Sequence, residues 1–137
     1  EGKIEEIDEV DFLKREVSYE NSRFDLFYQK GEKKGFIEVK GVTLEENGIA
    51  KFPDAPTERG AKHLRELIKA KEEGYEAAVL FVIQMEDVVD FAPNDVTHPA
   101  FGEALREAAA AGVNVVAYAC RVAPDRLVID HPIPVRL

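Results

Sequence analysis

Cysteine and long apolar runs are nearly absent from this chain of 137 residues. The single cysteine, Cys120, has no partner for an intramolecular disulfide, so no disulfide framework supports the fold. We interpret Cys120 as a small apolar residue that ends a buried strand, rather than as a reactive thiol. No apolar run approaches the roughly 18 residues of a membrane-spanning helix. With no signal-peptide pattern either, we expect a cytoplasmic protein without a membrane partner.

An excess of positive charge is also missing, because the formal net charge is −9. This balance argues against a simple basic nucleic-acid binder. However, 11 of the 18 lysines and arginines fall between residues 23 and 71. They indicate either a helix with a solvated Lys/Glu face or a positive surface around an acidic centre. Charge counts alone favour the solvated face.

The residues that are present predict one α/β domain with its own core. A polar turn with two glycines joins two alternating segments into a β-hairpin. Two segments with helical spacing alternate with two continuous apolar runs, which predicts buried parallel strands with crossover helices. The expected hairpin strands are residues 22–29 and 35–42, the helices are 58–73 and 99–111, and the buried strands are 77–84 and 113–120.

Shorter elements are expected at both ends and after the hairpin. Residues 10–19 are expected to begin as a helical turn and to end as a short strand at 17–19. The turn-forming pair Asn47-Gly48 leads into a third strand, Ile49–Phe52. Either Thr57 or Asp54 is expected to cap the first helix, and Thr97 the second. Prolines place the two segments nearest the end of the sequence, 126–130 and 134–137, at sheet edges.

The segment FIEVKGV, which starts at Phe36, carries two opposite charges inside a predicted strand. Side chains alternate along a strand, so Glu38 and Lys40 share one face. Asp25, on the paired hairpin strand, is able to approach Glu38 across the ladder. Two adjacent carboxylates repel unless a positive group lies between them, and Mg²⁺ prefers such oxygen ligands. The carbonyl of Val39 is a further candidate ligand, and Lys40 would orient or deprotonate a water or stabilise charge on a phosphate.

A plainer interpretation explains the same residues. Glu38 and Lys40 would form an exposed pair worth a fraction of a kcal/mol, and Asp25 would face solvent. The spacing Asp-x(12)-Glu-x-Lys by itself occurs often by chance, so this interpretation is preferred unless the surrounding sequence adds something.

The surrounding sequence favours a functional site over the surface pair. The segments RFDLFY, FIEVKGVTL and FPDAPTERGAKHLREL together resemble the C-terminal domain of the sugar fermentation stimulation protein A family. The resemblance runs from about Glu16 to the closing PVRL. It implies a PD-(D/E)xK nuclease-like domain over residues 1–137, with a restriction-endonuclease-like mixed sheet flanked by helices. It further implies DNA binding without strong sequence preference and a part in transcription regulation of sugar metabolism.

The same resemblance also concerns the domain composition, because it implies that the sequence lacks one domain of the family. The family usually carries an N-terminal OB-like domain, which is missing from this sequence. The chain also begins with Glu rather than Met. We therefore interpret the sequence as a fragment of a longer protein.

Carried over residue by residue, the family motif makes Asp25, Glu38 and Lys40 the catalytic residues. Asp25, Glu38 and Val39 would hold Mg²⁺ or Mn²⁺. The sequence departs from the nuclease pattern before the first acid, where Phe24 replaces proline. Many nucleases of this fold place another Glu on a preceding helix, and Glu16 is the nearest candidate, although it falls at a predicted strand start.

A second group of candidates lies on the first predicted helix. Helix N-termini favour phosphates, so Thr57, Arg59 and Lys62 are expected to contact a DNA backbone. Capping by Thr57 with a solvated basic face explains them equally well. His63 is expected to pack in the core or to lie at the surface. Gln84 is expected to be a hydrogen-bonded residue at the end of its strand.

The leading hypothesis is a non-specific DNA-binding domain with a metal-dependent phosphodiesterase (nuclease) site. Whether it is an enzyme stays open at this point. The alternative is a non-catalytic DNA-binding regulator of sugar metabolism that retains the nuclease fold. A protein-interaction module is a third reading, and homodimer formation is left open.

Overall fold

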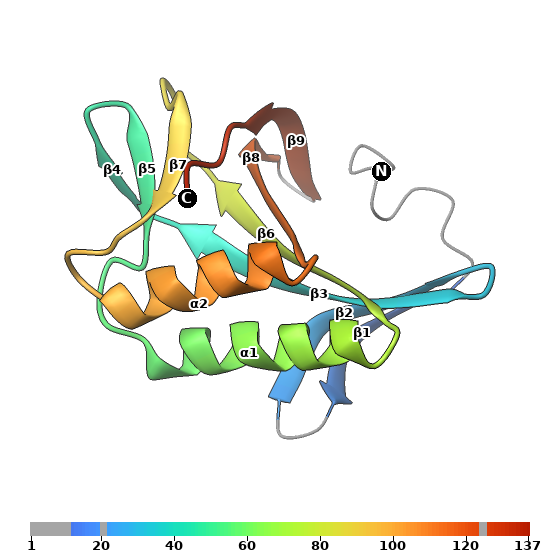
Figure 1. Ribbon diagram of the computed structural model, residues 1–137. Helices are drawn as coiled ribbons and strands as arrows, with labels where there is room; N and C mark the ends of the chain where they lie inside the picture. Colours follow the sequence, from blue (N-terminus) through green and yellow to red (C-terminus); the bar gives the residue numbers. More distant parts are fainter. Residues whose placement is uncertain (1–11, 20–21, 124–125) are drawn as a thin grey trace.

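A six-stranded mixed sheet forms the centre of the computed structural model, which describes residues 12–19, 22–123 and 126–137 (Figure 1). β1, β2 and β3 are antiparallel, β3, β6 and β8 are parallel, and β9 returns antiparallel to β8. The strands lie in the order β1-β2-β3-β6-β8-β9. Their bounds are β1 Phe12–Tyr19, β2 Ser22–Lys30, β3 Lys33–Val42, β6 Glu76–Ile83, β8 Asn114–Ala123 and β9 Arg126–Ile133.

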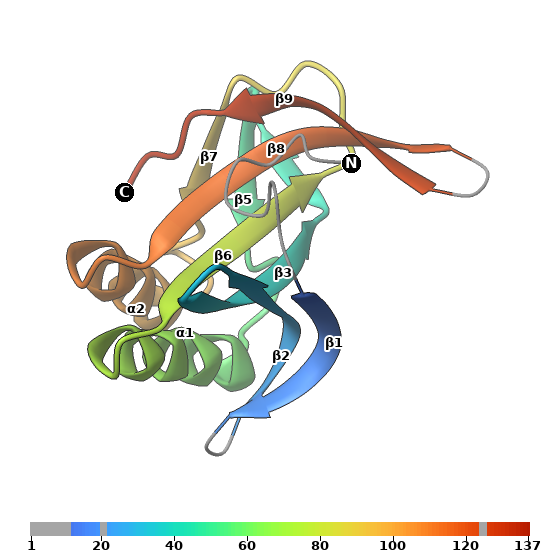
Figure 2. The same ribbon diagram turned by 90° about the vertical axis from the view of Figure 1, so that its right-hand side faces the viewer.

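Both helices cover the same face of this sheet (Figures 1 and 2). α1 spans Glu58–Glu72 and α2 spans Pro99–Ala110. Pro99 suits the first helical position, where no N–H partner is needed. Gly74, with φ of 99°, follows the end of α1 in the left-handed region, as is common after a helix. The two helices start at the same end of the molecule, beyond the carboxyl end of β3.

The main core lies between the helices and the sheet. Phe81 of β6 is fully buried, and its ring stacks on that of Phe91 at 4.2 Å between centroids. Leu64 and Leu67 of α1 and Phe101 of α2 are equally inaccessible. A second apolar cluster on the opposite sheet face includes Ile37 and Leu80. The alternation along β3 therefore sends Ile37 and Val39 to one face, and Phe36 and Glu38 to the helix-covered face.

A second, smaller sheet stands at the end of the molecule where the helices begin (Figure 1). It consists of β4 (Leu44–Glu46), β5 (Ile49–Phe52) and β7 (Asp90–Pro93), in that order. Asn47 and Gly48, with φ of 53° and 84°, make the turn between β4 and β5. The chain after β9 joins this sheet, since Val135 forms a bridge with Phe91.

The expected α/β architecture with a mixed sheet and packed helices is confirmed, including the parallel arrangement of β6 and β8. The parallel pairing of β3 with β6 was not predicted, since β3 was expected only as a hairpin strand. Residues from Phe12 onward form a strand, so the expected helical turn there is wrong from that residue on. β9 lies at a sheet edge, as its proline predicts. None of the described helices has the length and apolar character needed to cross a membrane.

Two further expectations need correction, and two short strands were not predicted. The third expected strand exists as β5, but it belongs to the small sheet rather than extending the hairpin. Thr97 does not cap α2, because His98 is the N-cap residue and the Thr97 hydroxyl instead accepts a hydrogen bond from Asn94. β4 and β7 were not expected at all, since each is too short to show a periodic pattern.

Candidate metal and active site

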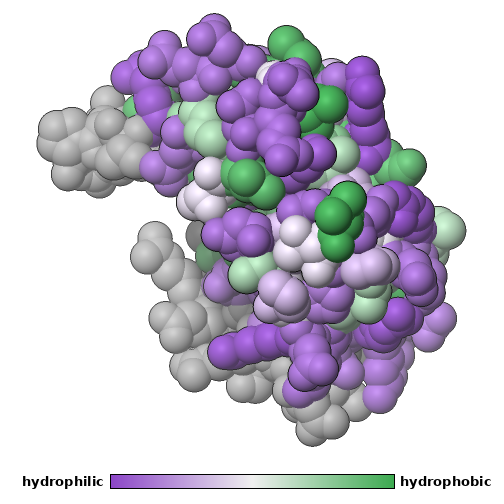
Figure 3. All heavy atoms as spheres, turned by 90° about the vertical axis from the view of Figure 1, so that its left-hand side faces the viewer, coloured by the Kyte–Doolittle hydropathy of each residue, from purple (hydrophilic) through white to green (hydrophobic). Residues whose placement is uncertain are grey.

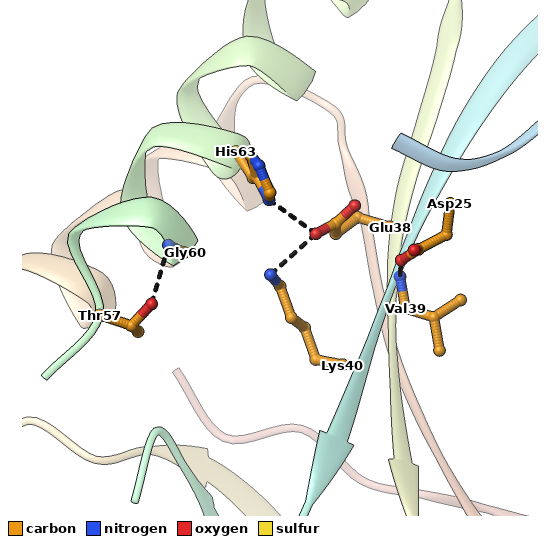
Figure 4. Close-up of polar contacts among 7 residues, drawn as sticks. All are labelled: Asp25, Glu38, Val39, Lys40, Thr57, Gly60 and His63. Atoms are coloured by element: carbon orange, nitrogen blue, oxygen red, sulfur yellow. Dashed lines mark hydrogen bonds and ion pairs between the residues drawn. The ribbon is translucent and has the colours of Figure 1, made fainter. Parts of the chain in front are cut away.

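The candidate site lies where β2 separates from β3. The backbone ladder of this hairpin ends at the pair Leu26↔Ile37. The next register position would pair Asp25 with Glu38. One position further, Val39 would pair with Phe24, but its N–H instead donates to Oδ2 of Asp25 at 2.7 Å (Figure 4). The two carboxylates predicted from the sequence are therefore neighbours, on two strands that are parting.

Glu38 is the most buried charged group of the site, with only 4% of its surface exposed. Its side chain points toward α1, where one oxygen receives two donors (Figure 4). Oε2 lies 2.8 Å from Nζ of Lys40 and 2.7 Å from Nδ1 of His63. The other oxygen, Oε1, is buried and has no hydrogen-bond partner within the described part of the chain. One half of this carboxylate is therefore saturated, and the other half is unpaired.

Asp25 is destabilised as an anion. Burial is the main factor that raises its pKa above the ordinary value, and the negative charge of Glu38 raises it further. The Val39 N–H and the positive charge of Lys40 act in the opposite direction without cancelling the rise. The contact between the Asp25 and Glu38 carboxyl groups also raises the pKa of Asp25. The pair would therefore gain from a nearby cation.

Lys40 is held inside the site rather than in solvent. Its side chain is 14% exposed, and that of Glu38 is 5% exposed. The interpretation of Glu38 and Lys40 as an exposed surface pair is therefore wrong. A lysine held in this way is a point donor beside the carboxylates, able to hydrogen-bond a water or an anionic oxygen.

His63 is the member of the site whose role was not predicted from the sequence. It lies on α1 and reaches Glu38, 25 residues away in the sequence. The signal was its place on the buried stripe of the helix, which also contains Gly60, Leu67 and Ala70. A titratable side chain on an apolar stripe needs a buried polar partner, and Glu38 is that partner.

The residues predicted to contact DNA lie on the first turns of α1. Thr57 is the N-cap of the helix, and its Oγ1 accepts from the N–H of Gly60 at 3.0 Å (Figure 4). Capping by Thr57, one of the two sequence interpretations, is therefore confirmed. Arg59 and Lys62 have exposed side chains on these turns. Their contact with DNA stays a prediction.

The helix starts present a largely hydrophilic surface. Figure 3 views the molecule from this end and shows mostly hydrophilic residues, with separate hydrophobic side chains between them. Val89 and Val96 are among the exposed hydrophobic residues of the structure, at 62% and 94% exposure. Such a surface is suited to polar partners more than to a broad apolar contact.

Two other candidates lie outside this group of contacts. Glu16 is in β1 between Arg15 and Val17, which pair with Leu26 and Phe24, so its register position is beside Asp25. Its side chain lies outside the described residues. Gln84 follows the end of β6, is exposed, and lines a cavity of about 810 Å³ that also contains Cys120.

The acidic residues available for a metal are few. Over the residues whose side chains are described, no group of three or more His, Cys, Asp or Glu side chains is arranged to hold a metal ion. A cation here would depend on Asp25, Glu38, backbone oxygen and water. Mg²⁺ characteristically binds through one or two carboxylates and keeps several waters.

Comparison with known proteins gives consistent results. Residues 1–126 match the family model described as the sugar fermentation stimulation protein RE domain. The sugar fermentation stimulation protein homolog of Clostridium beijerinckii is 57% identical over 129 residues, which cover 94% of this chain and 57% of that protein. The homolog of Thermoanaerobacter sp. is 51% identical over 136 residues, covering 99% and 59%. The chain thus spans somewhat more than half the length of these curated relatives.

A solved structure is similar over nearly the whole chain. It is the structure of Pyrococcus furiosus SfsA in complex with Ca²⁺, with a TM-score of 0.89 and 29% sequence identity. The similarity covers 98% of this chain and 58% of the other.

Proposed function

The chain belongs to the sugar fermentation stimulation protein family, and from that premise we propose that it binds DNA without sequence preference and hydrolyses phosphodiester bonds with a divalent cation. Asp25 and Glu38 would hold the cation. The observation that carries the proposal is the unpaired Oε1 of Glu38, buried beside a second carboxylate.

The residues of the site fit a hard cation. A buried carboxylate oxygen without a donor is costly, and a cation removes that cost while reducing the repulsion from Asp25. Mg²⁺ or Mn²⁺ would take one oxygen from each acid, with the carbonyl of Val39 as a third ligand. The related Pyrococcus protein was solved in complex with Ca²⁺, which supports a bound divalent cation in this family. Ca²⁺ shares the preference for oxygen ligands.

The side chains around the acids have distinct roles in this proposal. A bound cation would supply Lewis-acid activation of water and neutralise charge on the phosphate. Lys40 orients the water and stabilises negative charge that develops on the phosphate oxygens, since its ammonium is fixed beside Glu38. Arg59 and Lys62 hold the DNA backbone at the start of α1, where the helix dipole also favours phosphate.

One observation favours the alternative, a DNA-binding regulator without catalysis. Oε2 of Glu38 already has both Lys40 and His63 as partners, so this half of the site is compensated by the protein alone. In that reading the acid, the lysine and the histidine are a buried structural network, and DNA is bound through Arg59 and Lys62 only. Partners, cytoplasmic location and homodimer formation are proposals under either reading.

Metal dependence separates the two readings. We would titrate Mn²⁺ and Mg²⁺ by calorimetry into the chain, into Glu38→Ala and into Glu72→Ala, and test plasmid nicking with the same samples. Glu72 is an exposed residue near the end of α1, so its variant controls for loss of one negative charge. Binding and nicking that disappear only in Glu38→Ala support the nuclease. No binding at millimolar concentration in the original chain would reject it in favour of the regulator.

A further inference from the structure

The carboxylate of Glu38 has two oxygens in different surroundings, and the side chains of His63 and Lys40 both contact the same oxygen, Oε2. Oε2 lies 2.7 Å from Nδ1 of His63, whereas Oε1 has no partner within the described residues. A carboxylate that holds a cation is ionised and only accepts hydrogen bonds, so in the proposed cation site Nδ1 of His63 would be the donor in this contact. The contact with His63 therefore determines that the protein pairs with Oε2 and that Oε1 is available to another ligand.

His63 controls this choice better than Lys40 does. Lys40 belongs to the same strand as Glu38 and has a flexible four-carbon stem. The His63 ring is short and stiff, its side chain is 9% exposed, and it comes from a different element. Leu64 and Leu67, both fully buried, hold this part of α1 against the sheet. The position of the His63 side chain is thus set by core packing of α1 rather than by contacts within the site.

We propose that His63 is a positioning residue, which holds Glu38 with Oε1 turned to the cation and links the proposed DNA-contact turns of α1 to the cation site. This inference rests on the proposed cation site. His63 would not touch the metal or the phosphate. A hydrogen-bonded partner behind a metal ligand orients that ligand, and its loss commonly weakens metal binding by roughly tenfold to a hundredfold.

The link to α1 follows from the order of residues on the helix. Arg59 and Lys62 are exposed residues on the first turns of α1, close before His63 in the sequence. Thr57 caps the same end of the helix. A shift of this turn would move the phosphate contacts and the Glu38 partner together. Binding of the cation and binding of the DNA backbone would therefore be coupled through the hydrogen bond between His63 and Glu38.

The test compares substitutions that keep or remove the donor at the position of Nδ1. Asparagine places its amide nitrogen close to where Nδ1 lies, so His63→Asn retains the bond. His63→Leu has a similar size and no donor. Mn²⁺ affinity would be measured by calorimetry for both variants and the original chain, with unfolding temperature recorded for each. We expect His63→Leu to bind Mn²⁺ at least roughly tenfold more weakly. His63→Asn should stay within a few-fold of the original chain.

The outcomes are distinguishable. If the original chain binds Mn²⁺ and a folded His63→Leu binds it equally well, the positioning role is rejected while the cation site stands. Equal weakening in His63→Asn and His63→Leu also rejects it, because ring packing would then be the cause. If His63→Leu does not fold, His63→Gln replaces it, since glutamine places its nitrogen where Nε2 lies. Equal affinity of His63→Asn and His63→Gln would then overturn the proposal. No Mn²⁺ binding by the original chain rejects the cation site and the positioning role together.

Discussion

Thr57 and His98 join the starts of the two helices, because the N–H of Thr57 donates to Nδ1 of His98 at 2.7 Å. Each residue is the N-cap of its own helix. Thr57 therefore uses its backbone for the contact with α2 and its hydroxyl for the cap of α1. The helix starts near the candidate site are held in place by polar contacts in addition to the core.

Removing the cap should loosen this end of α1. We expect Thr57→Ala to lower the free energy of unfolding by about 1 kcal/mol, since the Gly60 N–H loses its partner. Thr57→Ser keeps a hydroxyl and should stay close to the original stability. Urea unfolding followed by circular dichroism measures both. An unchanged midpoint for Thr57→Ala would show that the cap contributes nothing.

The basic residues of α1 should govern DNA binding through phosphate contacts. We expect Arg59→Ala and Lys62→Ala each to weaken binding equally for different sequences and to reduce the slope of log K against log salt by about one. Fluorescence anisotropy with two unrelated duplexes gives both quantities. Lys34→Ala is the matched control, because this exposed lysine lies near the β2–β3 turn, far from the start of α1 (Figure 1). The same loss in all three variants would argue against a localised interface.

Two glycines of β3 should respond very differently to alanine. A Cβ at Gly35 would lie 2.5 Å from the ring of Tyr28, which is 3% exposed and donates its hydroxyl hydrogen to Glu76. At Gly41 no atom beyond those of the adjacent residues lies within 4 Å of the same position. We expect Gly35→Ala to cost about 1–3 kcal/mol by overpacking. Gly41→Ala should be nearly neutral, and thermal unfolding of the pair provides the comparison.

The thiol of Cys120 should react slowly. Burial is the main factor that raises its pKa above the ordinary value, and the charge of Asp130 adds to the rise. The thiolate fraction at pH 8 is then lower than in an unfolded chain, so alkylation by iodoacetamide should be slower in the native protein than in urea. The alkylation rate of the native protein should keep rising as the pH passes through the raised pKa of Cys120. Equal rates in both states at pH 8 would contradict the assignment.

The pKa shift also has a consequence for stability. Because the native state holds the Cys120 proton more tightly than the unfolded state, raising the pH from the ordinary thiol pKa through the raised value lowers stability. Cys120→Ala should remove this part of the alkaline dependence.

The parts of the fold that the sequence predicted are those with long, regular patterns. The run of apolar residues in β6 could only be buried on both faces, and Thr57 and Gly74 marked the two limits of α1. Asp25 and Glu38 were found because hairpin pairing makes them neighbours, and the structure places them one step beyond the ladder. The inferences on strands and helices depend on local periodicity, whereas the choice of Asp25 and Glu38 as site residues also depended on the family resemblance.

The parts that were missed depend on tertiary contacts. β7 is four residues long and exists because β5 pairs with it, which no local pattern reveals. His63 was assigned to packing or to the surface, since its partner is 25 residues away on another element. Its position on the buried stripe of α1 was visible in the sequence, but the identity of its partner was not.

The parting of β2 and β3 at Asp25 has a consequence for motion. Asp25 is carried by the β1–β2 ribbon, whereas Glu38 and Lys40 are carried by the central parallel strands. No backbone bond between β2 and β3 sets the separation of the two acids, since the ladder ends at Ile37. Flexing of the ribbon would therefore change that separation without breaking the central sheet. In amide hydrogen exchange, the Val39 N–H would report this flexing directly, because the carboxylate of Asp25 is what protects it.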